Sequence, residues 1–226
     1  MIETTRVRAR HAEYLRNWLA EWSLHRRMRA EDGVDDNPEF TGDVKAPQLG
    51  GMVALPQIRL LYPDCRAAWE RPVYAALLDK FADDSFLAVP FSRFCTPALP
   101  GELLTSRSQP QFKVLCIWNS FAIGEERLLT GWHVDVLDEA ELQDAMNIYR
   151  CLVDDCAMPV DLLMRTGPPL VSPQDPRWTY QDEELGLIAA IDGADYSSES
   201  KPIYEINETS REYRSMAAER NIDDLG

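Results

Sequence analysis

Two kinds of apolar spacing divide the chain. Over residues 3–30, apolar side chains recur at helical intervals, with Leu15, Trp18, Leu19 and Trp22 at positions i, i+3, i+4 and i+7. From residue 52 to residue 137, the apolar runs are short and separated by turn residues, which is typical of strands in a β-barrel or sandwich. The pattern therefore predicts an N-terminal amphipathic helix followed by a mostly β domain.

The β domain is expected to hold five main strands and one further short strand near Leu103. Pro56 lies inside the first apolar run and indicates a sheet edge or a bulge, because proline cannot donate a backbone hydrogen bond. A long segment rich in Pro, Gly and Ser, residues 96–111, is expected to be a loop. The main strands are expected over residues 52–61, 73–78, 86–91, 113–119 and 132–137.

A second helix is predicted directly after the last strand. Asp138 is a good N-cap residue, and Glu141 three positions later completes a capping-box pattern. After residue 160 the signals weaken: Leu185–Ile191 is a short apolar run, and residues 206–220 are either a marginal helix or a disordered tail. The apolar stripe of the second helix is Leu142, Ala145, Met146, Tyr149 and Leu152.

These elements predict three parts and an α+β class that is mainly β with helices. An N-terminal helix and linker occupy residues 1–45, a β domain with its helix occupies residues 46–160, and an acidic, partly irregular extension occupies residues 161–226. The chain is long enough for one ordinary domain with extensions, or for two small domains.

Charge is unevenly distributed along this acidic chain. The chain has 23 Lys and Arg against 38 Asp and Glu, and its formal net charge is −15. Residues 1–30 hold seven arginines and three glutamates, whereas residues 166–226 hold five basic and thirteen acidic residues. The overall charge argues against broad electrostatic attraction to nucleic acid.

Composition also bears on location and on cofactors. No apolar stretch approaches the roughly 20 residues needed to span a bilayer, and no secretory signal is recognisable. The five cysteines suit a reducing compartment, so a cytoplasmic protein that does not bind membranes is expected. Cys151 and Cys156 have no nearby histidine and no C-x-x-C motif exists, so neither a metal site nor a cofactor is predicted.

Six short pieces of the β domain follow one another in an informative order. A strand begins after a glycine, an Arg-Pro pair opens the second strand, and the third strand ends in Pro-x-Ser. A strand with a polar end, a short Glu-Arg-Leu turn, and a strand leading into a capped helix follow. The pieces are Gly51–Arg59, Glu70–Tyr74, Phe86–Arg93, Val114–Asn119, Glu126–Leu128 and Val136–Leu142.

In this order of pieces, roughly residues 51–155 resemble the MazF/PemK-type toxin family. The resemblance implies an SH3-like, partly open β-barrel with a C-terminal helix, and a metal-independent endoribonuclease that works as a homodimer. By the same resemblance, Arg71 of the Arg-Pro pair and Ser92 of Pro-x-Ser are the catalytic residues. A guanidinium can hold the scissile phosphate, and a hydroxyl can help move the proton of the attacking 2′-OH. The product would be a cyclic phosphate.

Four further residues are candidates for binding RNA. Arg59 and Arg93 could face the same groove as the catalytic pair, and Trp118 with Asn119 could stack and bind a base. Structural alternatives remain open: Arg71 could form a strand-end salt bridge, Ser92 could satisfy a backbone group as the strand turns, and Arg59 could be an exposed strand residue. Trp118 could equally pack in the core or in a dimer interface. His133 is a possible general base, but a structural or surface histidine is the stronger interpretation.

Two readings of the function remain open. In the first, the chain is a toxin-type endoribonuclease or a weakened relative, restrained by its own extension. The acidic, aromatic segment Trp178–Glu184 would imitate nucleic acid and cover the groove. In the second, the same fold is a non-catalytic module that binds an antitoxin or another protein partner.

Overall fold

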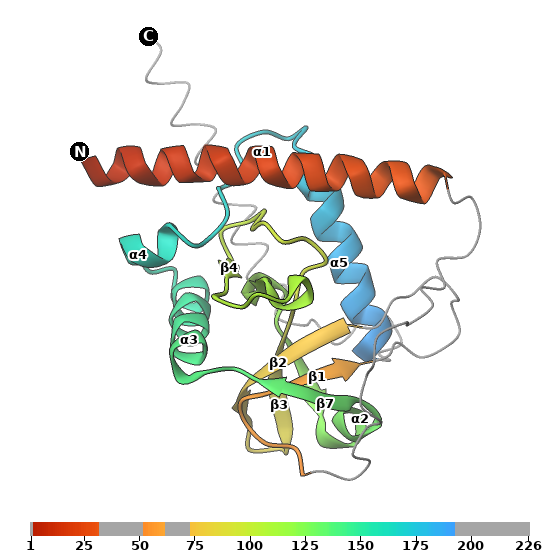
Figure 1. Cartoon of the computed structure of the whole chain (residues 1–226). Coiled ribbons are helices and arrows are strands. Elements are labelled where there is room, and N and C mark those ends of the chain that lie inside the picture. Colours follow the sequence, from red (N-terminus) through yellow and green to blue (C-terminus); the bar gives the residue numbers. More distant parts are fainter. Residues whose placement is uncertain (1, 32–51, 62–72, 193–226) are drawn as a thin grey trace. The chain divides into compact units, whose positions relative to one another are not determined.

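The computed structural model describes residues 2–31, 52–61 and 73–192. The chain divides into two compact units, residues 1–193 and 194–226, and all described residues lie in the first unit. This unit is an α+β structure, as expected (Figure 1). Its α-helices are α1 (Ile2–Glu31), α2 (Glu125–Thr130), α3 (Glu139–Val153), α4 (Val160–Leu163) and α5 (Arg177–Asp192).

Five strands form the main sheet in the order β6-β3-β2-β1-β7, and every pair is antiparallel. A second sheet pairs β4 with β5, and two 3₁₀ turns flank β5. In the described part of the chain, β6 and β7 are unpaired edges of the main sheet, so the sheet is open. The strands are β1 (Gln57–Leu61), β2 (Val73–Lys80), β3 (Ser85–Pro90), β4 (Glu102–Leu104), β5 (Val114–Cys116), β6 (Phe121–Gly124) and β7 (Trp132–Val136).

The main sheet is buried on both faces. Along β2, Val73, Ala75 and Leu77 belong to one apolar cluster, whereas Ala76 and Leu78 belong to another. Side chains alternate between the two faces of a strand, so the two clusters lie on opposite faces. A central strand with near-continuous apolar residues is therefore required.

α3 covers one face of the sheet. The side chain of Asp138 accepts a hydrogen bond from the backbone N–H of Glu141, and the Glu141 side chain completes the predicted capping box. Ala145 and Ile148 are fully buried in the cluster on this face. All five residues of the predicted stripe pack in this cluster or against it.

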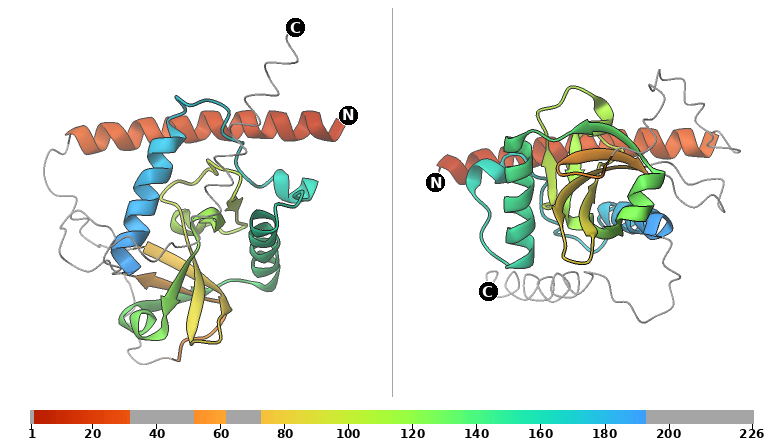
Figure 2. Two further views of the ribbon diagram at one scale, coloured as in Figure 1. Left: turned by 180° about the vertical axis from the view of Figure 1, so that it is seen from behind. Right: turned by 90° about the horizontal axis from the view of Figure 1, so that it is seen from below.

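α2 and α5 cover the other face, and Figure 2 shows the sheet between α3 and these two helices. Leu128 of α2 and Ile188 and Ile191 of α5 are buried there. The sheet is thus the middle layer of a helix–sheet–helix arrangement, which protects both apolar faces from water.

α1 makes a third apolar cluster at one end of this sandwich (Figure 1). Trp18 and Trp22 stack with centroids 5.3 Å apart and contact Phe94 and Tyr180. Toward its N-terminus, α1 is held by two hydrogen bonds to backbone carbonyl oxygens. His11 Nε2 lies 2.9 Å from the carbonyl oxygen of Leu163, and the Tyr14 hydroxyl donates to the carbonyl oxygen of Met164 over 3.0 Å. The predicted Trp/Leu stripe is therefore the docking face of α1.

Several local predictions were wrong. The strand expected over residues 113–119 is only Val114–Cys116, because the chain turns into a 3₁₀ helix over Ile117–Asn119. Edge strand β6 and helix α2 were not predicted, and α5 was expected only as an acidic segment and a short apolar run. In addition, the first strand begins only at Gln57, after Pro56, and it is an interior strand rather than an edge, although it does carry a bulge against β7. The helical share is therefore larger than the mainly β expectation.

Candidate functional site

Ser92 lies just beyond the end of β3, under α5. Its backbone N–H donates to the carbonyl of Val114 over 2.8 Å, which holds the residues after β3 against β5. The side chain is 3% exposed, and its oxygen accepts a hydrogen bond of 3.0 Å from the backbone N–H of Phe94. Ser92 Oγ also lies 3.0 Å from the hydroxyl oxygen of Tyr180 on α5. Ser92 is therefore inaccessible to a large substrate in this conformation.

Arg71, the other catalytic candidate, lies outside the described residues. The strand that follows it begins at Val73, and the register pairs Ala75 of that strand with Pro90 of β3. The backbone N–H of Phe91 donates to the carbonyl of Tyr74 over 2.7 Å. The start of β2 and the residues after β3 therefore lie at the same end of the sheet.

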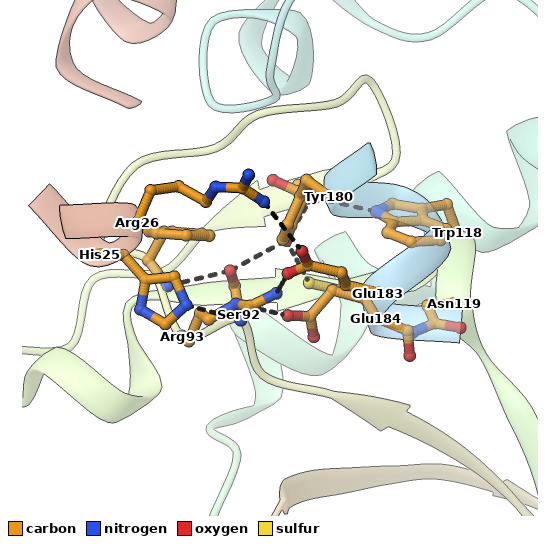
Figure 3. A network of polar contacts seen from close by, with 12 residues as sticks. His25, Arg26, Ser92, Arg93, Trp118, Asn119, Tyr180, Glu183 and Glu184 are labelled. Atoms are coloured by element: carbon orange, nitrogen blue, oxygen red, sulfur yellow. Dashed lines mark hydrogen bonds and ion pairs between the residues drawn. The ribbon is translucent and has the colours of Figure 1, made fainter. Parts of the chain in front are cut away.

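Arg93 is bound by acidic groups of α5. Its guanidinium lies 2.7 Å from a carboxylate oxygen of Glu183 and 2.9 Å from one of Glu184. It also lies 3.0 Å from Nε2 of His25 on α1, where the imidazole nitrogen must accept because arginine can only donate. Figure 3 shows Arg93 between these three side chains. The side chain is 15% exposed, so the ion pairs are largely shielded from water.

Rings surround the same guanidinium. The Arg93 Cζ atom lies 5.4 Å from the ring centroid of Phe94, 5.9 Å from that of Trp22 and 6.0 Å from that of Tyr180. These distances fall within the range of cation–π attraction. α1, α5 and the segment after β3 therefore share one cationic group.

Glu102 is a buried acid at the centre of this region. It accepts hydrogen bonds from the backbone N–H of Ala98, from the indole of Trp118 and from the hydroxyl of Tyr180. Complete burial raises the pKa of Glu102 to about 7, although these three donors oppose the rise. Burial also raises the pKa of Tyr180 well above its usual value, so this phenol stays protonated.

Donor and acceptor roles in the Glu102–Tyr180–Ser92–Phe94 network follow from the groups at its two ends, a carboxylate and a backbone N–H. The Glu102 carboxylate can only accept when it is ionised, and in that protonation state the Tyr180 hydroxyl hydrogen points to it over 3.0 Å. Ser92 must then donate its own hydroxyl hydrogen to Tyr180, while accepting from Phe94. The Ser92 hydroxyl is thus committed on both sides and is not activated as a base or nucleophile.

Trp118 and Asn119 lie against the same helix. Trp118 is half-buried and its ring centroid lies 6.4 Å from that of Tyr180. Asn119 is 4% exposed and donates from its amide nitrogen to the backbone carbonyl of Glu184 over 3.2 Å. Both residues therefore contact α5 in this structure, and Asn119 is buried beneath it.

Arg59 and His133 lie elsewhere. Arg59 is 4% exposed and donates to the backbone carbonyls of Leu128 and Gly131, each over 3.0 Å, where it fixes the turn between α2 and β7. Burial lowers the pKa of Arg59. His133 is exposed on edge strand β7, with Nε2 3.0 Å from the carbonyl oxygen of Asp135. Arg59 is thus not assembled with Ser92.

Of the six site residues expected from sequence, four meet around α5: Ser92, Arg93, Trp118 and Asn119. Sequence reasoning did not single out Glu102 or His25. The one available signal was a glutamate between Gly101 and two leucines, since an acid in an apolar strand is commonly buried with donors. The acidic, aromatic segment Trp178–Glu184 is part of α5, and its Tyr180, Glu183 and Glu184 contact Ser92 and Arg93.

Within the described ranges, no group of three or more His, Cys, Asp or Glu side chains is arranged to hold a metal ion. None of the described helices is both long and apolar enough to cross a membrane. No protein-family model, no curated protein and no solved structure matches this chain.

Proposed function

We propose that this chain is a self-restrained relative of the MazF/PemK-type toxins, a metal-independent endoribonuclease whose RNA groove is covered by its own helix α5. One observation carries the proposal. Helix α5 places Tyr180 on Ser92 and two glutamates on Arg93, which are neighbouring residues at the end of β3. A homodimer and an antitoxin-like partner belong to the same proposal.

The order of elements supports the family assignment. β1, the Arg-Pro pair ahead of β2, and the Pro90-x-Ser92 end of β3 follow one another as in that family, and β5, the Glu126–Leu128 piece in α2, β7 and α3 complete the series. The antiparallel sheet with a separate β4–β5 pair is compatible with a partly open SH3-like barrel. The proposed fold is therefore that barrel, extended by α1 and α5.

The chemistry of α5 supports mimicry of nucleic acid. Carboxylates on an arginine reproduce the charge and hydrogen-bond pattern of a phosphate, and a tyrosine ring takes the place that a base occupies beside aromatic side chains. Glu183, Glu184 and Tyr180 supply these groups from one helix (Figure 3). Asp182 adds to the charge of this turn. The helix would thus compete directly with RNA.

The proposed reaction uses Arg71 together with two residues, Ser92 and Arg93, that displacement of α5 would free. Arg71 would hold the scissile phosphate and stabilise its developing charge, and Arg93 would bind a neighbouring phosphate. Ser92, once released from Tyr180, would bind a phosphate oxygen or assist the proton leaving the 2′-OH. The 2′-oxygen attacks phosphorus, the 5′-oxygen leaves with a proton, and a 2′,3′-cyclic phosphate forms.

A second candidate is favoured by the depth at which α5 is anchored. Arg177, at the start of α5, is 1% exposed and donates to the carbonyls of Ala98, Pro168 and Pro169. Ile188 and Ile191 are buried in the sheet at its other end. A helix fixed at both ends suits a permanent part of the core, and the chain would then be a non-catalytic module that binds a protein partner.

Point substitutions separate these candidates better than removal of the extension. Deleting α5 would uncover Trp18 and the sheet face under Ile188, so a misfolded product would be uninformative. The combination Tyr180→Phe/Glu183→Gln/Glu184→Gln keeps the shape of the helix. It removes both carboxylates from Arg93 and frees the Ser92 hydroxyl.

The assay is cleavage of a single-stranded RNA in the presence of a chelator, with the product end analysed for cyclic phosphate. The triple variant is expected to cleave at least about tenfold faster than the unaltered chain. Weakening the docking of α5 by roughly 1.4 kcal/mol raises the fraction of molecules with α5 displaced tenfold. The same variant carrying Arg71→Ala and Ser92→Ala should be inactive.

A further variant, Ile188→Asp/Ile191→Asp, is designed to detach the other end of α5. It covers the case in which the triple variant leaves the helix docked. Limited proteolysis reports whether α5 is released, and circular dichroism reports whether the sheet stays folded. Released, folded variants that do not cleave RNA would overturn the nuclease proposal. If these variants still bind a protein partner after Arg71→Ala/Ser92→Ala, the binding module is supported instead.

A further inference from the structure

Two cysteines lie in contact at the end of α3, away from the proposed RNA groove. The Sγ atoms of Cys151 and Cys156 are 2.9 Å apart. Cys151 lies in the last turn of the helix and is half-buried, whereas Cys156 is exposed in the segment leading to α4. No other pair of cysteines among the described residues has this relationship, since Cys95 and Cys116 stand apart.

The backbone holds the two thiols together. Asp155 adopts a left-handed conformation with φ of 50°, which turns the chain back toward the helix. The backbone N–H of Cys156 then donates to the carbonyl of Cys151 over 3.1 Å. The contact between the sulfurs is thus set by a short hydrogen-bonded turn and needs no large movement to become a covalent bond.

We propose that Cys151 and Cys156 form a reversible dithiol–disulfide pair that exchanges with small neutral disulfides. Cys156 is the attacking thiol because it is exposed, and Cys151 is the resolving thiol because it lies behind it.

The exchange balances in two steps. The Cys156 thiolate attacks one sulfur of the small disulfide, and the displaced thiolate leaves and takes up a proton. The Cys151 thiolate then attacks Sγ of Cys156 and displaces the second small thiol. The protein loses two thiol hydrogens, and the small disulfide accepts two electrons and two protons.

The surroundings favour a neutral reaction partner over an anionic one. The thiols sit at the negative end of a helix dipole, beside Asp154 and Asp155. The hydrogen bond between the two thiols, with smaller contributions from burial, from the charge of Cys156 and from Asp154, raises the pKa of Cys151 to about 11. The Cys151 thiolate is therefore scarce at neutral pH. The two aspartates repel a negatively charged disulfide such as oxidised glutathione.

The test uses the full chain carrying Cys65→Ser, treated with bis(2-hydroxyethyl) disulfide and analysed by intact mass and peptide mapping. Cys151 and Cys156 should lose two free thiols without retaining the reagent, and dithiothreitol should restore both. Cys95 is the internal control, because an exposed thiol without a neighbouring thiol should keep one reagent half as a mixed disulfide.

Two variants assign the roles of the cysteines. Cys151→Ser should leave the reagent half attached to Cys156, since no resolving thiol remains. Cys156→Ser should leave Cys151 largely unmodified over the same time. If the unaltered pair instead carries a reagent half on each cysteine, or stays reduced while Cys95 reacts, the proposal is wrong.

Discussion

The two faces of the main sheet are covered by helices that dock in different ways. α3 docks on one face mainly through apolar side chains such as Ala145 and Ile148, and two of its acids, Glu141 and Asp144, also form ion pairs with Arg107 and Arg165. α5 buries Ile188 and Ile191 on the other face, but its first turns are held by a hydroxyl, two carboxylates and a guanidinium. Docking by apolar area is indifferent to pH and salt, whereas the docking of α5 depends on both.

The difference shows where this molecule can be switched. A face held mainly by packing responds weakly to conditions, because dispersion and the hydrophobic effect involve no charge. A face held by buried acids and paired arginines responds to protonation and to competing ions. The proposed RNA groove lies on the second kind of face, and the following four predictions probe this contrast in order of decreasing effect.

The largest effect is expected at the anchor of α5. Arg177→Ala removes a buried guanidinium that donates to three backbone carbonyls and pairs with Asp175. Leaving these acceptors and the acid without partners should lower the free energy of unfolding by about 3–5 kcal/mol. Urea denaturation measures this loss. Arg150→Ala, at an exposed site on α3, is the matched control and should change stability by less than about 0.5 kcal/mol.

A somewhat smaller loss is expected from the apolar face. Ile148→Ala deletes fully buried methyl groups under α3 and should cost about 2–4 kcal/mol, with Ile148→Val costing roughly 1 kcal/mol. The loss should be the same at pH 5.5 and pH 8, and in low and high salt. A clear pH dependence of this loss would contradict the view that packing alone stabilises the Ile148 site.

Glu102 should make stability fall as pH rises. Its pKa is about 7 in the folded chain and 4.5 as the ordinary value, so the folded state binds more protons between these pH values. Stability linked to this group is full below pH 4.5, declines up to about pH 7 and is flat above, a total of roughly 3 kcal/mol.

The check is the pH dependence of urea unfolding between pH 4.5 and pH 8 for Glu102→Gln. The substituted amide does not titrate, so the decline should be smaller than in the unaltered chain. The absolute stability of the variant is a separate matter, because an amide offers one acceptor oxygen where the carboxylate uses both. An unchanged slope would place the titrating group elsewhere.

The smallest effect is expected from the outer ion pair. Glu183 pairs with Arg93 and more distantly with Arg26, but its side chain is 24% exposed. Glu183→Gln should cost no more than about 1 kcal/mol, and the cost should shrink in high salt because ions screen the pair. Glu184→Gln, whose side chain is 2% exposed, is the comparison and should cost more and respond less to salt.

Local sequence signals were enough for the elements whose cues lie close together. The capping box of Asp138 and Glu141, followed by a regular apolar stripe, predicted α3 and the residue at which it begins. The Trp/Leu spacing likewise predicted α1. These elements are encoded within a few turns of chain, so propensity and periodicity agree with the final structure.

α5 could not be predicted in the same way. Its apolar residues Tyr180, Ile188 and Ile191 face two different clusters, so they do not form a single stripe. Its acidic residues look solvent-exposed in sequence, and only the position of Arg93, ninety residues earlier, explains their burial. Edge strand β6 was not predicted because four residues are too few to show a strand-like alternation of apolar and polar side chains. Pairing with β3 decides its conformation.

The sequence by itself determined the α+β class, the capped helix after the last strand, the docking stripe of α1 and an acidic, aromatic segment near Tyr180. The tertiary structure alone decided that this segment is a helix on Ser92 and Arg93, that Arg59 points away from them, and that Glu102 is a buried acid. The reason is physical: helical and strand periods are local properties of the chain. Burial, ion pairing and pKa are set by partners that only the folded backbone brings within a few ångströms.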